Sequence, residues 1–211
     1  MDAFSASLMA DKREIVFAPT VYKFQTFAQM AEEFKLGERD VVLTNEFIYT
    51  PFMKELGLKC NFVFQEKFGA GEPSEAMIQT MYDAIPYDSY DRVIAVGGGA
   101  IMDLCKLLGC KRPDTVHNLY FKRFPVVHEK DVIAIPTTCG TGSEVTNISI
   151  LALLSRRTKK GLAHESMFAD QAVLIPELLK GLPFSVFATS SIDALIHAIE
   201  SSLSPKTSAT T

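Results

Sequence analysis

The sequence predicts an α/β fold built on a parallel sheet with helices on both faces, and three observations support this. Segments of strand character alternate with segments of helical periodicity through most of the chain. The apolar runs at 41–43 and 93–96 do not alternate with polar residues, as is typical of strands buried on both sides. A glycine run at 97–99 ends one strand and precedes a helix, as in Rossmann-like folds, where ligands bind at this point.

The expected elements follow one another in a regular order. Pro51 is expected to break the second helix, Gly57 to end it, and Ser74 to cap the third helix. Two apolar arms around the polar stretch 155–160 predict a hairpin at 147–163. Before it, we expect strands within 13–24, 39–45, 59–68, 91–100 and 130–138, and helices within 26–36, 46–56, 71–85 and 101–110.

From Pro183 onward the pattern is helical, which indicates the start of a second, all-helical domain. The stretch 189–205 begins with three potential N-caps, Thr189, Ser190 and Ser191, and a helix there should stop before Pro205.

Composition excludes several classes of protein. The chain has 211 residues, of which 21 are basic and 25 acidic, and its net charge of -4 argues against a nucleic-acid partner. The first residues lack the pattern of a signal peptide, and no apolar run is long enough to cross a bilayer. The four cysteines form no Cys-x-x-Cys pair, so we expect reduced thiols and a cytoplasmic protein.

The glycines Gly97, Gly98 and Gly99 have two interpretations. Backbone N–H groups and a helix N-terminus at this turn suit a pyrophosphate. Met102 occupies the place of the last glycine of the dinucleotide fingerprint, so a plain strand-to-helix turn stays equally open. We expect Asp103 in the first helical turn, where it would either favour the helix dipole or bind a ribose or an amide.

The loop 136–144, PTTCGTGSE, lacks the lysine of a Walker A loop. Thr137, Thr138 and Ser143 offer short hydroxyls at the end of a strand, where a flat ring or a ribose could lie. The alternative is a polar connecting loop. No histidine lies near Cys139 in the sequence, so we expect a small buried thiol and not a nucleophile.

Asp193 and His197 are four residues apart and should project from one helical face, where they could share a divalent ion. A solvated face is the alternative, because two ligands do not complete a metal site. The other histidines, His117, His128 and His164, are expected to be surface residues.

Three stretches together carry a resemblance to a known family. AVGGGAIMDLCK at 95–106, PTTCGTGSEVTN at 136–147 and SSIDALIHAIES at 190–201 resemble the iron-containing (group III) alcohol dehydrogenases, and the likeness extends over 17–211. A narrower likeness, to the 4-hydroxybutyrate dehydrogenases of that family, rests on the stretches 21–24, 43–52, 64–74, 156–163 and 172–184.

The resemblance implies a division of roles among residues. It makes 1–182 a dinucleotide-binding α/β domain and 183–211 the beginning of a truncated helical metal-binding domain. It assigns Asp193 and His197 as metal ligands, with Fe(II) as the usual ion and zinc as an alternative. Asn45 stands where many members carry an aspartate, which leaves the choice between NAD and NADP open. The residues it assigns to NAD are Gly97, Gly98, Gly99, Asp103, Thr137, Thr138, Lys160 and Asn45.

The implied reaction is hydride transfer between NAD and a primary alcohol or aldehyde, namely 4-hydroxybutyrate and succinate semialdehyde. The expected partner is this small molecule, with no nucleic acid or membrane, and with a homo-oligomer open for the full-length protein. Since two further histidine ligands are expected beyond Thr211, we expect a fragment with weak or absent catalysis. The alternatives are another metal-dependent enzyme of this scaffold, such as a glycerol-dehydrogenase-like protein, or a non-catalytic nucleotide-binding remnant.

Overall fold

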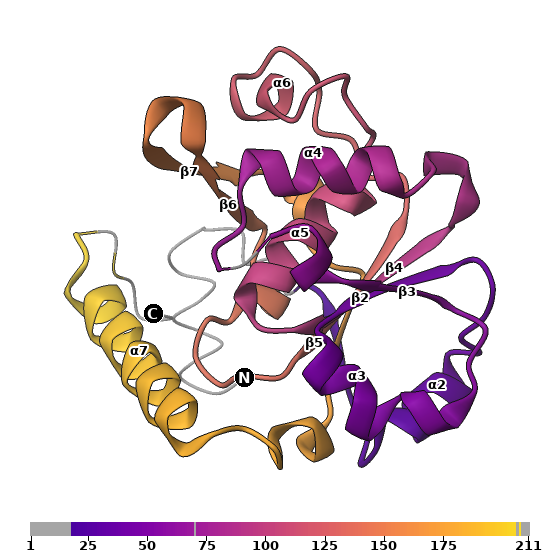
Figure 1. Cartoon of the computed structure of the whole chain (residues 1–211). Coiled ribbons are helices and arrows are strands. Elements are labelled where there is room, and N and C mark those ends of the chain that lie inside the picture. Colours follow the sequence, from indigo (N-terminus) through magenta and orange to yellow (C-terminus); the bar gives the residue numbers. More distant parts are fainter. Residues whose placement is uncertain (1–17, 70, 206, 208–211) are drawn as a thin grey trace, which may run out of the picture.

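A six-stranded parallel sheet forms the centre of the molecule, in the order β1-β8-β5-β4-β2-β3, and an antiparallel hairpin, β6–β7, lies beside it (Figure 1). This computed structural model describes residues 18–69, 71–205 and 207. The strands are β1 (Thr20–Lys23), β2 (Asp40–Thr44), β3 (Asn61–Phe64), β4 (Arg92–Gly97), β5 (Asp131–Pro136), β6 (Ile148–Leu153), β7 (Thr158–Ala163) and β8 (Gln171–Leu174). The α-helices are α2 (Phe27–Glu33), α3 (Glu46–Phe52), α4 (Glu75–Ala84), α5 (Gly99–Gly109), α6 (His117–Tyr120) and α7 (Phe184–Leu203).

Both faces of the sheet are covered, as the sequence predicts. Along β4, Val93 and Ala95 belong to one apolar cluster, and Ile94 and Val96 belong to another. The first cluster takes in α4 and α5, and the second takes in α2 and α3, which lie on the opposite side of the sheet (Figure 1). Successive side chains of a strand point to opposite faces, so an uninterrupted apolar run serves both clusters.

Several local predictions are confirmed. The hairpin forms, and the Ser74 hydroxyl caps α4 by accepting a hydrogen bond from the backbone N of Met77 at 3.2 Å. Gly57 has a left-handed φ of 59° and ends the short turn that follows α3. Pro51 lies in the last turn of α3, which ends one residue later at Phe52, and a separate short turn follows at Lys54–Leu56. The helix expected within 46–56 is therefore interrupted beside this proline, as predicted.

Two features of the C-terminal part differ from the expectation. Strand β8 was not predicted, and it lies between β1 and β5. Helix α7 begins at Phe184 after Pro183, so the prediction that Thr189, Ser190 and Ser191 cap it is wrong. The Thr189 and Ser190 hydroxyls instead donate to backbone carbonyls of the preceding turn. This local bonding keeps such residues within a helix. The helix ends before Pro205, as expected.

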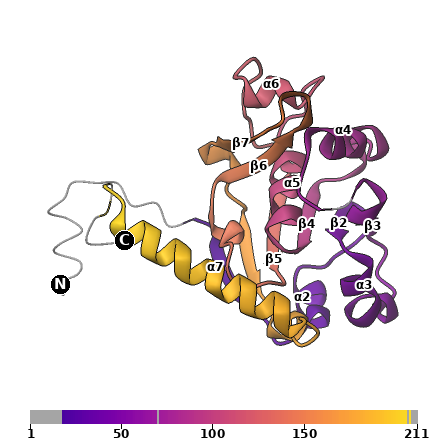
Figure 2. The same ribbon diagram turned by 60° about the vertical axis from the view of Figure 1, so that its left-hand side comes forward.

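Helix α7 runs along the outside of the sheet domain, below the hairpin (Figure 2). None of its residues is buried, although its first half approaches the loop after β5. The carboxyl ends of β4 and β5, the hairpin and α7 therefore surround one region of the molecule. No helix in the described ranges has the length and apolar character needed to span a membrane.

Candidate functional site

The turn between β4 and α5 is tight, and packing restricts two of its three glycines, Gly97 and Gly99. Gly97 is the last residue of β4, Gly98 is the N-cap of α5 and Gly99 is its first residue. A Cβ on Gly97 would overlap the side chain of Ile101, and one on Gly99 would lie 3.1 Å from the Thr141 side chain. The turn thus satisfies the plainer interpretation of the glycines. It also places the N-terminus of an 11-residue helix at the carboxyl edge of the sheet, where an anion is favoured.

The loop after β5 lies against this turn. Thr137 is buried, and its backbone N donates to the carbonyl of Gly97 at 3.0 Å. The Thr138 hydroxyl is 3.5 Å from the position that a Cβ on Gly98 would take. A Cβ on Gly140 would overlap the backbone carbonyl of Ser190, so only glycine allows α7 to come this close. Thr138 and Gly140 thus bring this loop close to both the turn at Gly98 and helix α7.

Asp103 belongs to the second turn of α5, so its expected place in the first turn is wrong and a dipole role does not apply. Its carboxylate oxygens accept hydrogen bonds from the Ser143 hydroxyl at 2.7 Å and from the backbone N of Ile150 at 3.0 Å. The side chain is 13% exposed, and burial raises its pKa. Asp103 therefore ties α5 to the loop and to β6, while one side of it still faces a cavity.

Lys106, one turn further along α5, is a buried charged residue beside the cavity that the sequence analysis did not single out. Its side chain is 1% exposed, and burial lowers its pKa to about 8. The ammonium donates to Ser143 Oγ at 2.9 Å, to Thr146 Oγ1 at 3.2 Å and to the carbonyl of Ile148 at 2.8 Å. The sequence did contain a sign of this burial, because Lys106 is the only charged residue in the apolar stretch 104–109. A lysine that is buried with such a stretch requires polar partners.

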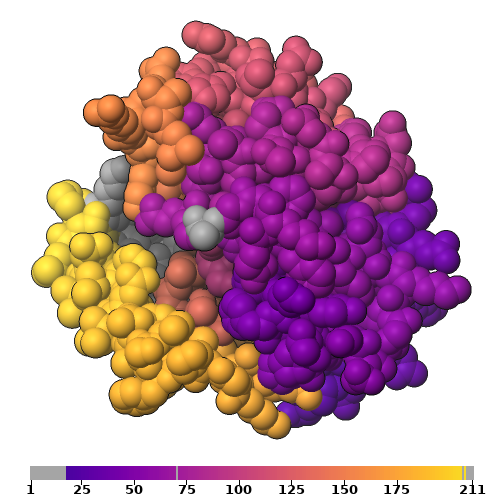
Figure 3. All heavy atoms as spheres, in the orientation of Figure 1, coloured from indigo at the N-terminus to yellow at the C-terminus, as the bar shows by residue number. Residues whose placement is uncertain are grey.

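These elements enclose a cavity of about 650 Å³. In the space-filling view the surface is hollowed between α7 and the body of the molecule (Figure 3). Of the residues predicted to bind cofactor or metal, Gly99, Asp103, Asp193 and His197 line the cavity, and Gly97, Gly98, Thr137 and Thr138 form the turns beside it. The other lining residues are Gly71, Glu72, Pro73, Ala100, Thr141, Ser143, Thr146, Ile148, Ile150, Ala152 and Lys159.

Two predicted cofactor residues lie outside this lining. Asn45 directly follows β2, and its amide is 3.5 Å from the side-chain oxygen of Gln65. The Lys160 ammonium lies 4.1 Å from the centre of the Phe121 ring, on the face of the hairpin that packs on the core, since Lys160 pairs with the buried Leu151. Lys159, its neighbour in β7, lines the cavity and donates to Glu72 at 2.6 Å. Adjacent strand residues face opposite sides, so only one of the two lysines can face the cavity.

The two predicted metal ligands lie on the inward side of α7. The Asp193 carboxylate and His197 Nδ1 are 3.7 Å apart, and both side chains are about half exposed. A carboxylate and an imidazole are suitable ligands for Fe(II) or zinc. They are the only His, Cys, Asp or Glu side chains besides Glu72 and Asp103 that line the cavity among the described residues. The pair can therefore supply part of a metal site from one wall.

Cys139 is not the buried thiol that we expected. It is partly exposed, and its sulfur lies 3.5 Å from Ser190 Oγ and 3.6 Å from Ser191 Oγ. These two hydroxyls lower the pKa of the thiol. The loop containing Cys139 passes over the first half of α7 instead of over the core, which explains the exposure. All four cysteines of the chain are unpaired.

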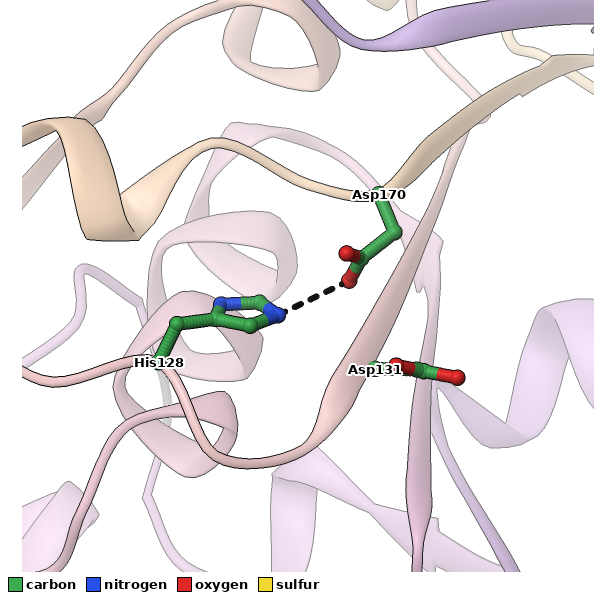
Figure 4. A group of neighbouring side chains, drawn as sticks. All are labelled: His128, Asp131 and Asp170. Atoms are coloured by element: carbon green, nitrogen blue, oxygen red, sulfur yellow. Dashed lines mark hydrogen bonds and ion pairs between the residues drawn. The ribbon is translucent and has the colours of Figure 1, made fainter.

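Two of the three histidines expected at the surface, His117 and His128, are partly buried in ion pairs, so that expectation is wrong for them; Figure 4 shows the pair of His128. His128 Nε2 is 3.0 Å from the Asp170 carboxylate, and its Nδ1 is 3.2 Å from the carbonyl of Ser166. Asp131 is near, but its carboxylate points away from the pair (Figure 4). Both ring nitrogens face acceptors, so the imidazolium form is favoured and the pKa of His128 is raised. His117 pairs with Glu75, and His164 is exposed.

Comparison with known proteins gives consistent matches. Residues 19–176 match the family model of iron-containing alcohol dehydrogenases. The chain is 50% identical over 188 residues to 4-hydroxybutyrate dehydrogenase of Clostridium kluyveri, covering 89% of this chain and 51% of that protein. It is 41% identical over 135 residues to sulfoacetaldehyde reductase of Bilophila wadsworthia, covering 62% and 34%. The chain thus spans about half of the first relative and a third of the second.

Solved structures show the same arrangement of elements. An iron-containing alcohol dehydrogenase from Thermotoga maritima superposes with a TM-score of 0.76 at 27% identity, covering 92% of this chain and 56% of that one. Sulfoacetaldehyde reductase from Bifidobacterium kashiwanohense, in complex with NAD+, superposes with a TM-score of 0.76 at 23% identity, covering 89% and 52%. The second likeness concerns the fold alone.

Proposed function

Because the chain belongs to the iron-containing alcohol dehydrogenase family, we propose that it supplies the NAD-binding part and two metal ligands of an oxidoreductase. The reaction is hydride transfer between the cofactor and a primary alcohol or aldehyde. The observation that carries this proposal is the shared cavity, which brings the turn at Gly99 and Asp103 together with Asp193 and His197. These two groups of residues are about 90 positions apart in the sequence and meet only in the fold.

The residues present fit both groups. The first turn of α5 offers N–H groups to a diphosphate, and Gly98 and Gly99 keep side chains out of its way. Asp103 can accept a hydrogen bond from a ribose hydroxyl or an amide of the cofactor. Thr137 and Thr138 hold the adjoining loop, and Asn45 follows the neighbouring strand β2. Lys159 supports the proposal better than Lys160 does, because it faces the cavity.

Asp193 and His197 would hold the divalent ion, Fe(II) in the first place and zinc as the alternative. Once bound, such an ion supplies Lewis-acid chemistry at the alcohol or aldehyde oxygen, and NAD supplies the hydride chemistry. The chain's own contribution would be to orient the two reactants, since the residues proposed to bind them line one cavity.

For the substrate we propose 4-hydroxybutyrate and succinate semialdehyde. The 50% identity to a protein of that activity supports this choice over other alcohols. We further propose that 183–211 begin a helical metal-binding domain after the α/β domain of 1–182. The exposed apolar side chains of α7, among them Ile192 and Leu195, support this division. The unpaired cysteines support a cytoplasmic location.

Titration of the purified 211-residue chain with NADH, followed by the cofactor's fluorescence, tests the cofactor site. We expect saturable binding that Gly99→Val abolishes, because the added side chain would press on Thr141 and obstruct the turn. Gly181→Val is the matched control, since nothing lies within 4 Å of a Cβ placed there. Absence of saturation with the unaltered chain would contradict the proposal.

Turnover is tested with NADH and succinate semialdehyde. We expect little or none from the 211 residues, because Asp193 and His197 alone do not complete a catalytic metal site. Rapid turnover would show that this part of the proposal is wrong. Residual activity that preferred dihydroxyacetone to succinate semialdehyde would favour a glycerol-dehydrogenase-like enzyme.

A further inference from the structure

The Lys106 ammonium lies immediately behind one wall of the cavity. Its hydrogen-bond partners Ser143, Thr146 and Ile148 all line the cavity, as does Asp103, whereas Lys106 itself does not. We call Asp103, Ser143 and Thr146 the polar wall. The residues of this wall come from α5 and from the loop that leads into β6, so a contact between these two segments has to hold it together.

The hydrogen bonds among Lys106, Ser143 and Asp103 fix the orientation of each of these side chains. An ammonium has three N–H donors, and all three have acceptors at 2.8–3.2 Å. The Ser143 hydroxyl accepts from Lys106, so its own proton is directed to Asp103, 2.7 Å away. The second Asp103 oxygen accepts from the backbone N of Ile150. The orientation of the Ser143 hydroxyl and of the Asp103 carboxylate is therefore set in part by a residue that does not line the cavity.

The charges of Lys106 and Asp103 also favour this arrangement of the polar wall. The Asp103 carboxylate is largely buried, and burial alone would favour its protonated form. The Lys106 ammonium lies 3.7 Å away and is the nearest cation, with Glu144 as the other acidic group that acts on it. The hydrogen bonds from Ile150 and Ser143 and this cation together favour the ionised form, in which Asp103 is a pure acceptor toward the cavity.

We propose that Lys106 is the positioning residue of the cavity, which holds the polar wall in place and orients Asp103 as an acceptor for the hydrogen-bond donors of the ligand. That this ligand is a nicotinamide dinucleotide rests on the proposed function. The ordering of segment 143–150 by Lys106 is independent of the proposed function. The two statements therefore have separate tests.

The first test needs no ligand and measures amide hydrogen exchange of 143–150 by mass spectrometry. In Lys106→Met we expect exchange faster by about 10- to 100-fold, because hydrogen bonds from a charged donor are lost. Lys106→Arg should retain most of the protection. Lys111→Met, an exposed lysine just beyond α5, is the matched control and should behave as the unaltered protein. Equal exchange in Lys106→Met and Lys111→Met would overturn the proposal.

Removal of the cation leaves a buried carboxylate, so Lys106→Met could fail to fold. The double variant Asp103→Asn with Lys106→Met removes both charges and keeps the comparison available. Its exchange at 143–150 should also exceed that of the control, and wild-type protection in a folded double variant would again overturn the proposal. Circular dichroism identifies which variants are folded.

The second test measures NADH affinity by fluorescence. Lys106→Met should weaken binding by about 10-fold or more, Lys106→Arg by much less, and Lys111→Met not at all. If the unaltered chain binds NADH and Lys106→Met binds it equally well, Lys106 has no role in positioning. If the unaltered chain does not bind NADH, the proposed function fails, and the exchange experiment still decides the role of Lys106.

Discussion

Gly140→Ala tests whether the close approach of α7 to the loop after β5 builds the site. A Cβ at this position would overlap the backbone carbonyl of Ser190. A backbone atom cannot rotate away as a side chain does, so α7 has to move by on the order of 1 Å to restore normal contact distances. Overpacking of this kind costs about 1–3 kcal/mol of unfolding free energy.

The thiol of Cys139 reports this movement. Its contacts with the Ser190 and Ser191 hydroxyls lower the pKa of this thiol, and a displaced α7 would weaken them. The other cysteines react slowly, because burial raises the pKa of Cys60 to about 11 and of Cys110 to about 12 and raises that of Cys105 as well. Alkylation with iodoacetamide as a function of pH therefore follows Cys139.

We expect Gly140→Ala to raise the pKa of Cys139 and to slow its alkylation at neutral pH. Gly142→Ala is the matched control in the same loop. Its φ of 62° makes alanine unfavourable by about 1–2 kcal/mol, but nothing lies within 4 Å of the added Cβ. Its thiol should react as in the unaltered protein. If both variants alkylate at the unaltered rate, the contact between Gly140 and α7 does not position Ser190, and the reasoning is refuted.

Three further predictions concern other parts of the molecule. Asp170 raises the pKa of His128 and His128 helps to lower that of Asp170, so the pair's contribution to stability is complete between about pH 4 and pH 6.5 and is lost as the pH rises through the folded pKa of His128. Urea unfolding of His128→Gln should lack this slope above pH about 6.5, and an unchanged slope would exclude the pair as its source. Ile94→Ala should lower the unfolding free energy by about 2–5 kcal/mol in the same assay, because the Ile94 side chain of β4 is fully buried. A smaller loss would indicate that neighbouring side chains fill the space left by the substitution. His197→Gln and Asp193→Asn should each weaken binding of Co(II), followed by its visible absorption, and equal affinity in both variants and the unaltered chain would remove this pair from the metal site.

The structure confirms the part of the prediction that rests on local pattern. Uninterrupted apolar runs identified β2 and β4, because strands covered on both faces need apolar side chains in both directions. The glycines at 97–99 marked the strand-to-helix turn, because side chains there would collide with Ile101 and Thr141. The i, i+4 spacing placed Asp193 and His197 on one helical face.

Other features depend on contacts between distant segments, which no local pattern records. The position of β8 between β1 and β5 is a matter of sheet topology, and the hydroxyls of Thr189 and Ser190 became helix-internal because α7 starts earlier, at Phe184. The sequence pattern indicated a charged hairpin turn, but only the strand register decided that Lys159 faces the cavity while Lys160 lies on Phe121.

By itself, then, the sequence determined the α/β class, the glycine turn and the spacing of the potential metal ligands, since each follows from the geometry of one strand, turn or helix. The tertiary structure alone decided that the turn and the ligands share one cavity. It also decided that a buried lysine stands behind the cavity wall, because Lys106 meets Ser143, Thr146 and Ile148 only after α5 has packed against the loop and β6.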